Sequence, residues 1–378
     1  MNRSPAQARA PFWPDGARAS QGHAITVTDG DDEATFSCLP GETVLFAGQA
    51  AGWDLPYECA SGGCGTCRAQ LLSGHVTSLW ADATGLTERD RRRGNRILLC
   101  QSRPAAACEL RSQARLRRLG DQLRRPARHE SRVTGIDLLT ADMMILEVDC
   151  GHPVPYLAGQ FVILEMADGT RRPYSMSGLA GPASGRLELL ARSKPGGAAS
   201  QWLFQRLAVG SRLTVEGPYG RAHAQSPASR PVVCVAGGSG LGQVLTIAEH
   251  CLAQDVTRPL SFYYGARSVA DLVLPERFDA LRRRGAAVIA VAETTGAAGA
   301  STGTSEAGKP GHDPCCDPDW GPVRTGLVVD AVAADHDDLT GHDLYVAGPA
   351  AMVDALLAAL VRTGRAAADR VFFDRFWT

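Results

Sequence analysis

The sequence predicts a multidomain chain that combines α+β and α/β folds. Three observations predict this: four cysteines spaced as metal ligands, then short alternating strands separated by Gly and Pro, then repeated units of strand, glycine turn and helix. At 378 residues, the chain is long enough for two or three domains. We expect a flexible tail at 1–22, domains at 23–112, 131–227 and 228–378, and an Arg-rich linker at 113–130.

Composition limits the classes of function. Hydrophobic residues make up 44% and charged residues 21%, which is ordinary for a soluble globular protein. The net charge of −1 implies no bulk attraction to nucleic acid or to a membrane surface. No apolar run is long enough to span a bilayer, and the N-terminal residues lack the apolar core of a secretory signal. Eleven cysteines suit a reducing compartment, so we expect a cytoplasmic location.

The cysteine-rich segment reads YECASGGCGTCR over Tyr57–Arg68. Cys59, Cys64 and Cys67 follow a C-x4-C-x2-C pattern, and Cys100 comes after 32 further residues. This is the spacing of plant-type 2Fe–2S ligands, in which four thiolates hold two irons. The small residues between them allow a tight loop whose N–H groups point at the sulfurs. Zinc is the less favoured alternative, because its sites usually use two C-x2-C pairs, and a disulfide loop or a chance spacing stays open.

The rest of this first domain is predicted from local patterns. His23–Cys38 shows two alternating apolar runs around a turn, which predicts a hairpin. Thr43–Ala51 is expected to form a short helix, and Thr87–Asp90 resembles a capping box that opens another. Ile97–Cys100 is expected to be an apolar strand that delivers the fourth cysteine.

Seven arginines crowd the segment that follows. They are Arg111, Arg115, Arg117, Arg118, Arg124, Arg125 and Arg128. A docking surface for an acidic redox partner or for nucleic acid is one interpretation. A solvated linker is favoured, because charge runs are usually exposed.

Two further domains follow the linker. Strands at Met143–Val148, Gln160–Met166, Leu187–Ala191 and Leu213–Glu216 predict a small antiparallel barrel. After residue 231, strands alternate with helices expected near 244–253 and 275–284, which indicates parallel β/α layers.

An insertion interrupts the third domain at 296–318, where apolar residues are few and Gly, Ser, Thr and Pro are frequent. We expect a flexible loop. Cys315, Cys316 and His312 suggest a metal site only weakly, because no second ligand pair accompanies them.

Two motifs in the barrel region favour a flavin dinucleotide. In RPYSMS, Arg172 can pair with a phosphate, Tyr174 can stack on a flat ring, and Ser175 can hydrogen-bond a ring nitrogen. In KPGGAAS, Gly197 and Ser200 lead into a predicted helix whose N-terminus suits a pyrophosphate.

Two more motifs point to a second nucleotide. VAGGSGLG, with Gly238 and Gly240, follows an apolar strand and opens a helix. YVAGP, with Gly348 and Pro349, follows another strand, and the carboxyl ends of such strands can face one crevice. Asp271 is placed to accept from a ribose 2′-hydroxyl and to repel a 2′-phosphate, which favours NADH over NADPH, although Arg267 opposes this.

Together these motifs resemble the ferredoxin–NADP reductase superfamily, in the subgroup with an N-terminal plant-type ferredoxin domain. The resemblance runs from about residue 24 to the C-terminus, and includes EGPYG (Glu216–Gly220) and AGP where relatives have CGP. It implies a β-grasp ferredoxin domain, an antiparallel β-barrel flavin domain and a parallel α/β nicotinamide-binding domain. The cluster domain comes first, which implies FAD, since relatives that bind FMN typically place it last.

The resemblance also implies residue roles. Arg172 would bind FAD phosphate, and Gly197 and Ser200 its pyrophosphate. The catalytic set would be Ser175 near flavin N5, Tyr174 stacked on the isoalloxazine, and Phe376 close to the flavin. The nicotinamide dinucleotide would lie against Gly238, Gly240, Asp271, Gly348 and Pro349.

YECASGGCGTC, SLWADATGL and FFDRF (Phe372–Phe376) are similar to the reductase component of toluene 4-monooxygenase-type diiron systems. This implies electron transfer from NADH through FAD and a 2Fe–2S cluster to an oxygenase component or its small ferredoxin, in aromatic hydrocarbon catabolism. The alternatives are the reductase of a Rieske dioxygenase or of a deoxysugar-forming enzyme, and a redox-silent docking module. Ala347 stands where the family usually has cysteine, which supports the redox-silent docking module. Gly242-Gln243 stands where the family commonly has Ala-Pro.

Overall fold

A computed structural model describes residues 22–121, 123–178, 185–225, 230–294, 315–317 and 319–377. Most of the expected tail, and the insertion apart from 315–317, lie outside these described residues, so His312 and the side chains of Cys315 and Cys316 do too. The chain divides into two compact units. The first comprises Met1–Ser131, Val162–Pro173 and Arg212–Tyr219, and the second Arg132–Phe161, Tyr174–Ser211 and Gly220–Thr378.

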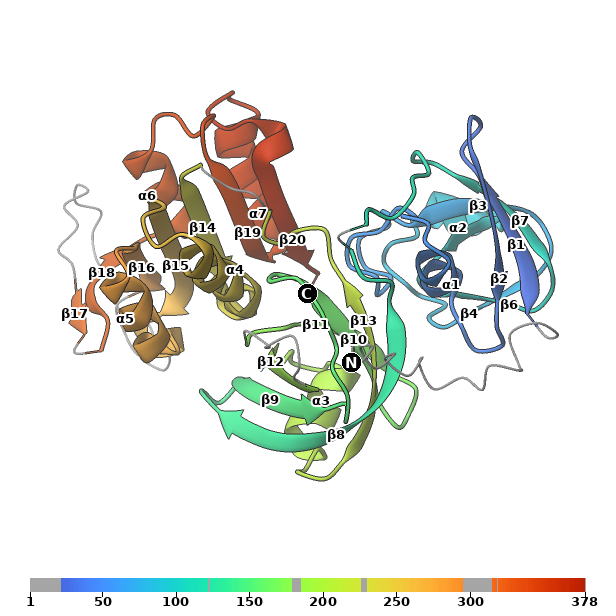
Figure 1. Ribbon diagram of the computed structural model, residues 1–378, viewed down its shortest axis with the longest axis horizontal. Coiled ribbons are helices and arrows are strands. Elements are labelled where there is room, and N and C mark those ends of the chain that lie inside the picture. The colour runs from blue at the N-terminus through green and yellow to red at the C-terminus, as the bar shows by residue number, and fades with distance from the viewer. Residues whose placement is uncertain are drawn as a thin grey trace, which may run out of the picture. The chain divides into compact units, whose positions relative to one another are not determined.

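The first unit contains a five-stranded sheet in the order β2-β1-β7-β3-β5. The strands are β1 (His23–Thr28), β2 (Glu33–Cys38), β3 (Arg68–Ser73), β5 (Arg96–Leu98) and β7 (Cys108–Ser112). β1 pairs antiparallel with β2, which confirms the predicted hairpin, and parallel with β7. Helix α1 (Val44–Ala50) begins at Thr43, whose Oγ1 accepts from the Phe46 amide, and its buried side packs on β2. The β-grasp expectation is confirmed (Figure 1).

The second helix of this unit follows the predicted capping box. In α2 (Glu88–Arg93), the Thr87 hydroxyl accepts from the Asp90 amide, and the Asp90 carboxylate accepts from the Thr87 amide. Two short strands, β4 (Val76–Ser78) and β6 (Ser102–Pro104), pair nearby. Cys100 lies in the turn after β5 and not in a strand, so that detail of the prediction was wrong.

A six-stranded sheet follows the order β11-β10-β13-β8-β9-β12 and is nearly closed, as a barrel requires. Its strands are β8 (Ala127–Leu138), β9 (Met143–Asp149), β10 (Phe161–Glu165), β11 (Arg171–Ser175), β12 (Arg186–Arg192) and β13 (Arg212–Tyr219). All four predicted strands are present. β9 pairs antiparallel with β8 and with β12. β8 begins inside the segment 113–130 that was expected to be a linker.

The second unit contains a seven-stranded sheet in the order β17-β18-β16-β15-β14-β19-β20. The strands are β14 (Val232–Gly237), β15 (Leu260–Ser268), β16 (Ala287–Thr294), β17 (Cys315–Asp317), β18 (Gly321–Thr325), β19 (Asp343–Pro349) and β20 (Val371–Phe376). Every pairing is parallel except that of β17 with β18. The predicted parallel α/β domain is confirmed.

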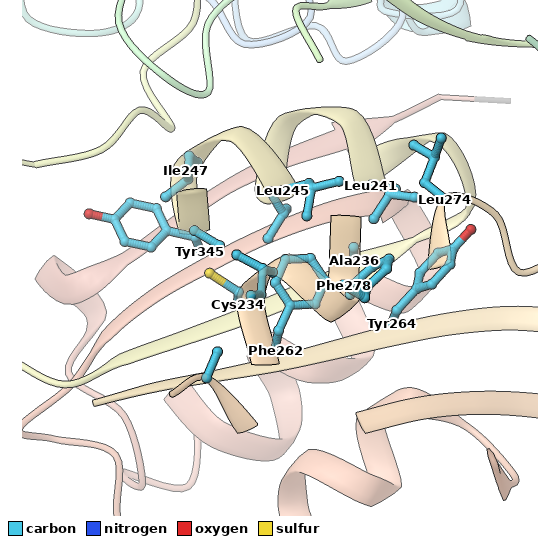
Figure 2. Packing of buried hydrophobic residues seen from close by; sticks show 14 of the residues in the cluster. Cys234, Ala236, Leu241, Leu245, Ile247, Phe262, Tyr264, Leu274, Phe278 and Tyr345 are labelled. Atoms are coloured by element: carbon cyan, nitrogen blue, oxygen red, sulfur yellow. The ribbon is translucent and has the colours of Figure 1, made fainter. Parts of the chain in front are cut away.

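Helices cover both faces of this sheet because the side chains of each strand alternate. Cys234 and Ala236 of β14 pack under α4 (Leu241–Gln254) and α5 (Pro275–Arg283), in the cluster drawn in Figure 2. Val233 and Val235 face the other way. They pack under α6 (Val328–Asp335) and α7 (Ala350–Leu356), which continues as a π-helix over Leu357–Val361.

Aromatic rings fill the α5 side of the first cluster. The Phe278 ring lies 5.5 Å from Tyr264 in a stacked arrangement and 5.1 Å from Phe262 edge to face. Trp320 closes the group at 4.9 Å from Phe278. No helix among the described residues is long and apolar enough to cross a membrane.

Candidate functional site

The four predicted ligand cysteines come together as two pairs. The Sγ atoms of Cys67 and Cys100 lie 3.2 Å apart, and the Cys64 amide donates to Cys59 Sγ at 3.4 Å. The pairing of β3 with β5 sets Arg68 opposite Leu98, which brings the residues flanking these strands close together. Three of the cysteines are buried, and Cys64 is partly exposed.

The loop that holds the cysteines depends on close backbone packing. A Cβ on Gly65, where φ is +78°, would lie 2.6 Å from the Gly85 carbonyl oxygen. The Gly85 amide donates to the Gly62 carbonyl, and the Thr66 amide donates to Cys64 Sγ at 3.4 Å. Backbone N–H groups therefore point at two of the sulfurs, as the small residues predicted.

This donor set fits a 2Fe–2S cluster. Two pairs of thiols supply two sulfurs to each of two irons. The nine described cysteines are all free, which argues against a disulfide loop. A hydrogen bond between the Cys59 and Cys64 side chains lowers the pKa of Cys59 and raises the pKa of Cys64.

The predicted flavin motif forms strand β11. Successive side chains of a strand point to opposite faces, so Arg172 and Tyr174 share one face, and Ser175 lies on the other with Arg171. Ser175 is buried, whereas Arg172 and Tyr174 are half-buried. The Arg172 guanidinium lies 5.4 Å from the centre of the Trp80 ring, and its Nη1 donates to the Arg171 carbonyl.

The predicted pyrophosphate turn leads into helix α3 (Ala198–Gln205). Gly197 is the N-cap and has no side chain to cap the helix, so the first-turn amides are left for other acceptors. The buried Ser200 hydroxyl accepts from the Lys194 amide at 2.7 Å, which closes the turn. Ser200 therefore lies in the first turn of α3, and its contact with a pyrophosphate stays a prediction.

The two glycine turns of the second unit lie against each other. Gly238 and Gly240 form a short 3-10 turn between β14 and α4. A Cβ on Gly240 would lie 2.1 Å from the Ala347 carbonyl oxygen, so only glycine fits there. A Cβ on Gly348 would lie 3.0 Å from the Gly237 carbonyl oxygen. The ends of β14 and β19 thus meet, as the strand-end argument predicted.

Phe376 is placed at the same strand ends. β20 pairs with β19 in parallel, and Phe376 lies opposite Pro349 in that register. The Phe376 side chain is half-buried and packs against the cluster under α4. The structure therefore brings together Gly238, Gly240, Gly348, Pro349 and Phe376.

Both oxygens of the Asp271 carboxylate already have partners in the structure. Its Oδ2 accepts from the Ser268 amide and hydroxyl at 3.1 and 2.9 Å, which caps a short 3-10 turn. Its Oδ1 lies 3.7 Å from Arg192 Nη2. Arg192 also pairs with Asp142 at 2.9 Å, and a Cβ on Gly238 would lie 2.8 Å from its Nη1.

Sequence reasoning missed Asp142 and Arg192. No local signal marks them, because they lie at the same end of the β9–β12 pairing but 50 residues apart in the sequence. Arg267, 67% exposed, also reaches Asp142 at 3.4 Å. Two acids and two arginines therefore form one ion-paired group, and Arg192 is its member next to Gly238.

A second missed group is a buried ionic network in the first unit. Arg128 pairs with Glu165 at 2.9 Å and with Glu216 at 3.3 Å, and Arg171 pairs with both at 3.3 and 2.5 Å. The Tyr219 hydroxyl donates to Glu216. Arg128 had been assigned to a solvated linker, but its side chain is 18% exposed.

Family comparisons agree with these two cofactor regions. Residues 27–105 match the family described as 2Fe-2S iron-sulfur cluster binding domain, and residues 130–223 match the oxidoreductase FAD-binding domain. The fold and the site therefore define an oxidoreductase that carries both FAD and a 2Fe–2S cluster.

Similar proteins narrow this class. The chain is 42% identical over 352 residues, 92% of this chain and 99% of the other, to the ferredoxin–NAD(+) reductase component of the alkene monooxygenase system of Xanthobacter autotrophicus (strain ATCC BAA-1158 / Py2). It is 33% identical over 92% of its length, and 98% of the other, to a ferredoxin–NAD(P)(+) reductase of Metapseudomonas resinovorans. The solved ferredoxin reductase in carbazole 1,9a-dioxygenase has a TM-score of 0.77 and 28% identity, covering 94% of this chain and 99% of that one. The chain belongs to the ferredoxin–NAD(P)+ reductases of the ferredoxin–NADP reductase superfamily that carry an N-terminal 2Fe–2S domain.

Replacing Arg171 with Met is expected to lower the free energy of unfolding by about 3–5 kcal/mol, because it leaves Glu165 and Glu216 buried with one cation fewer. Urea unfolding followed by circular dichroism measures this. The matched control is Arg324→Met, which removes a 43% exposed partner of Asp335 and should change stability by about 1 kcal/mol or less. Equal losses in both variants would contradict the network's role.

Proposed function

We propose that the protein is an NADH-dependent reductase that supplies electrons to the oxygenase component of an aromatic- or alkene-type diiron monooxygenase, or to its small ferredoxin. The observation that carries this is the end-to-end match with the reductase component of an alkene monooxygenase system, which keeps all domains in the same order. The paired cysteines and the two facing glycine turns support it independently.

When bound, FAD accepts two electrons from NADH and the 2Fe–2S cluster passes them on singly. The protein's own residues set position and access. Arg172 is proposed to hold an FAD phosphate, and Gly197 and Ser200 its pyrophosphate. Tyr174 is proposed to stack on the isoalloxazine, and Ser175 to contact its N5.

The nicotinamide dinucleotide is proposed to bind where β14 and β19 end, against Gly238, Gly240, Gly348 and Pro349. Phe376, on the adjacent strand, is proposed to cover the flavin until the nicotinamide arrives. Cys59, Cys64, Cys67 and Cys100 are the proposed cluster ligands. Electrons are proposed to leave near Cys64, because it is the one of these four cysteines with partial exposure.

Two kinds of oxygenase are candidate partners. A Rieske dioxygenase is favoured by the relatives named as components of carbazole and naphthalene dioxygenase systems. The higher identity to the alkene monooxygenase component favours the diiron partner. Reconstituted turnover with each purified oxygenase decides between them. Turnover with neither, in a sample that cannot reduce cytochrome c, would favour the redox-silent module that Ala347 first suggested. The nine free cysteines support our proposal of a reducing, cytoplasmic location.

Cys64→Ala is expected to separate the two cofactors. Loss of a ligand should remove the cluster, so NADH-driven reduction of cytochrome c falls about 100-fold or more, while reduction of ferricyanide by the flavin is kept. Visible spectra and stopped-flow kinetics measure both. The control is Cys150→Ala, a buried cysteine outside the ligand set. Full cytochrome c reduction by Cys64→Ala would refute its role as a ligand.

Arg172→Ala is expected to weaken FAD binding about 10- to 100-fold, since a hydrogen bond to a charged group contributes about 1.5–3 kcal/mol. Fluorescence titration of the apoprotein with FAD measures the dissociation constant. Arg186→Ala, an exposed arginine at the start of β12, is the control. FAD affinity unchanged in Arg172→Ala would exclude the phosphate contact.

The enzyme is expected to prefer NADH over NADPH at least about tenfold in kcat/KM, because Asp271 is proposed to accept from the ribose 2′-hydroxyl and to repel a 2′-phosphate, against the opposing charges of Arg192 and Arg267. Asp271→Asn keeps a capping oxygen for Ser268, and it should lower the ratio of kcat/KM for NADH to kcat/KM for NADPH several-fold. Asp369→Asn, an 80% exposed acid, should not. A native preference for NADPH would overturn the assignment.

A further inference from the structure

Gln243 is a buried amide at the point where three segments of the second unit meet. Its side chain is almost fully inaccessible, and its Nε2 donates to Asp374 Oδ2 at 2.6 Å and to the Ala222 carbonyl at 3.0 Å. Gln243 belongs to the first turn of α4, Ala222 to the chain after β13, and Asp374 to β20. A buried amide of this kind is stable only when such bonds are made.

The first turn of α4 is itself fixed to the barrel strands of this unit. A Cβ on Gly242 would lie 3.0 Å from the Leu190 Cβ and 3.1 Å from the Ser177 Cβ. Thr246, one turn further on, donates to the Gln243 carbonyl at 2.7 Å. Gln243 therefore projects from a rigid point next to the glycine turn.

Asp374 and Phe376 lie two residues apart in β20, so their side chains point to the same face of the sheet. The packing agrees with this alternation, because Phe372 and Phe376 contact the cluster under α4 and Phe373 contacts the opposite cluster. A hydrogen bond that fixes Asp374 thus fixes the part of β20 that presents Phe376.

We infer that Gln243 is a positioning residue that, through Asp374, holds Phe376 at the nicotinamide end of the flavin site; this rests on the function proposed above. The hydrogen bond therefore restrains the C-terminal strand at Asp374. It confines the movement that admits the nicotinamide to the Phe376 side chain and leaves the strand in place.

The test is Gln243→Leu in the FAD-loaded full-length protein. Stopped-flow reduction of the flavin by NADH is expected to slow about tenfold, because small misplacements of reacting groups reduce rates by this order or more. KM should change less than kcat. The visible-region circular dichroism of bound FAD, an activity-independent signal, should change as Phe376 shifts. Gln254→Leu, an exposed glutamine at the end of the same helix, is the matched control.

A second pair of variants isolates the hydrogen bond. Gln243→Glu places a second carboxylate beside Asp374. The repulsion between the two should slow flavin reduction at least as much as Gln243→Leu does. Adding Asp374→Asn restores one amide and one carboxylate, and should recover most of the loss. Native flavin reduction and native flavin dichroism in Gln243→Leu, or no recovery in the double variant, would overturn the inference. If the unmodified protein failed to accept electrons from NADH, the proposed function would fall, while the dichroism would still test the position of Phe376.

Discussion

The close approach of the ends of β14 and β19 is the constraint on which the second unit depends. A single extra carbon on Gly240 would lie within 2.1 Å of the Ala347 carbonyl, far inside any contact that packing tolerates. Because the two backbones touch, α4 must begin directly above them and β20 must end beside them. The positions of Gln243, Asp374 and Phe376 all follow from that contact.

Arg171 and Arg172 are adjacent in β11, so their side chains point to opposite faces of the strand. Arg171 points into the interior, where its guanidinium is paired with Glu165 and Glu216 and is not available to bind a ligand. Arg172 points to the other face, where its guanidinium lies near Trp80 and a phosphate is proposed to bind. The buried pairings contribute little net stability themselves, but they fix which of the two arginines faces outward.

Much of the fold and of the site could be predicted because the signals are local. The cysteine spacing, the Thr87 capping box and the glycine turns each act within a few residues, and the structure contains all of them. Partnerships across the chain could not be predicted. Arg128 meets Glu216 over 88 residues and Gln243 meets Asp374 over 131, and no spacing rule connects such positions. Arg128 was misjudged for the same reason, since a run of arginines does not show which of its members begins a strand.

The turn at 194–200, which we propose holds the FAD pyrophosphate, has a practical consequence for chemical labelling. The chain contains only two lysines, Lys194 and Lys309, and the second lies outside the described residues. Lys194 is exposed and opens the turn that Ser200 closes. An amine-reactive fluorophore would thus have few side chains to modify, and one of them lies in the turn that is proposed to hold the FAD pyrophosphate. Protection of that amine by FAD would give a direct optical measure of cofactor occupancy.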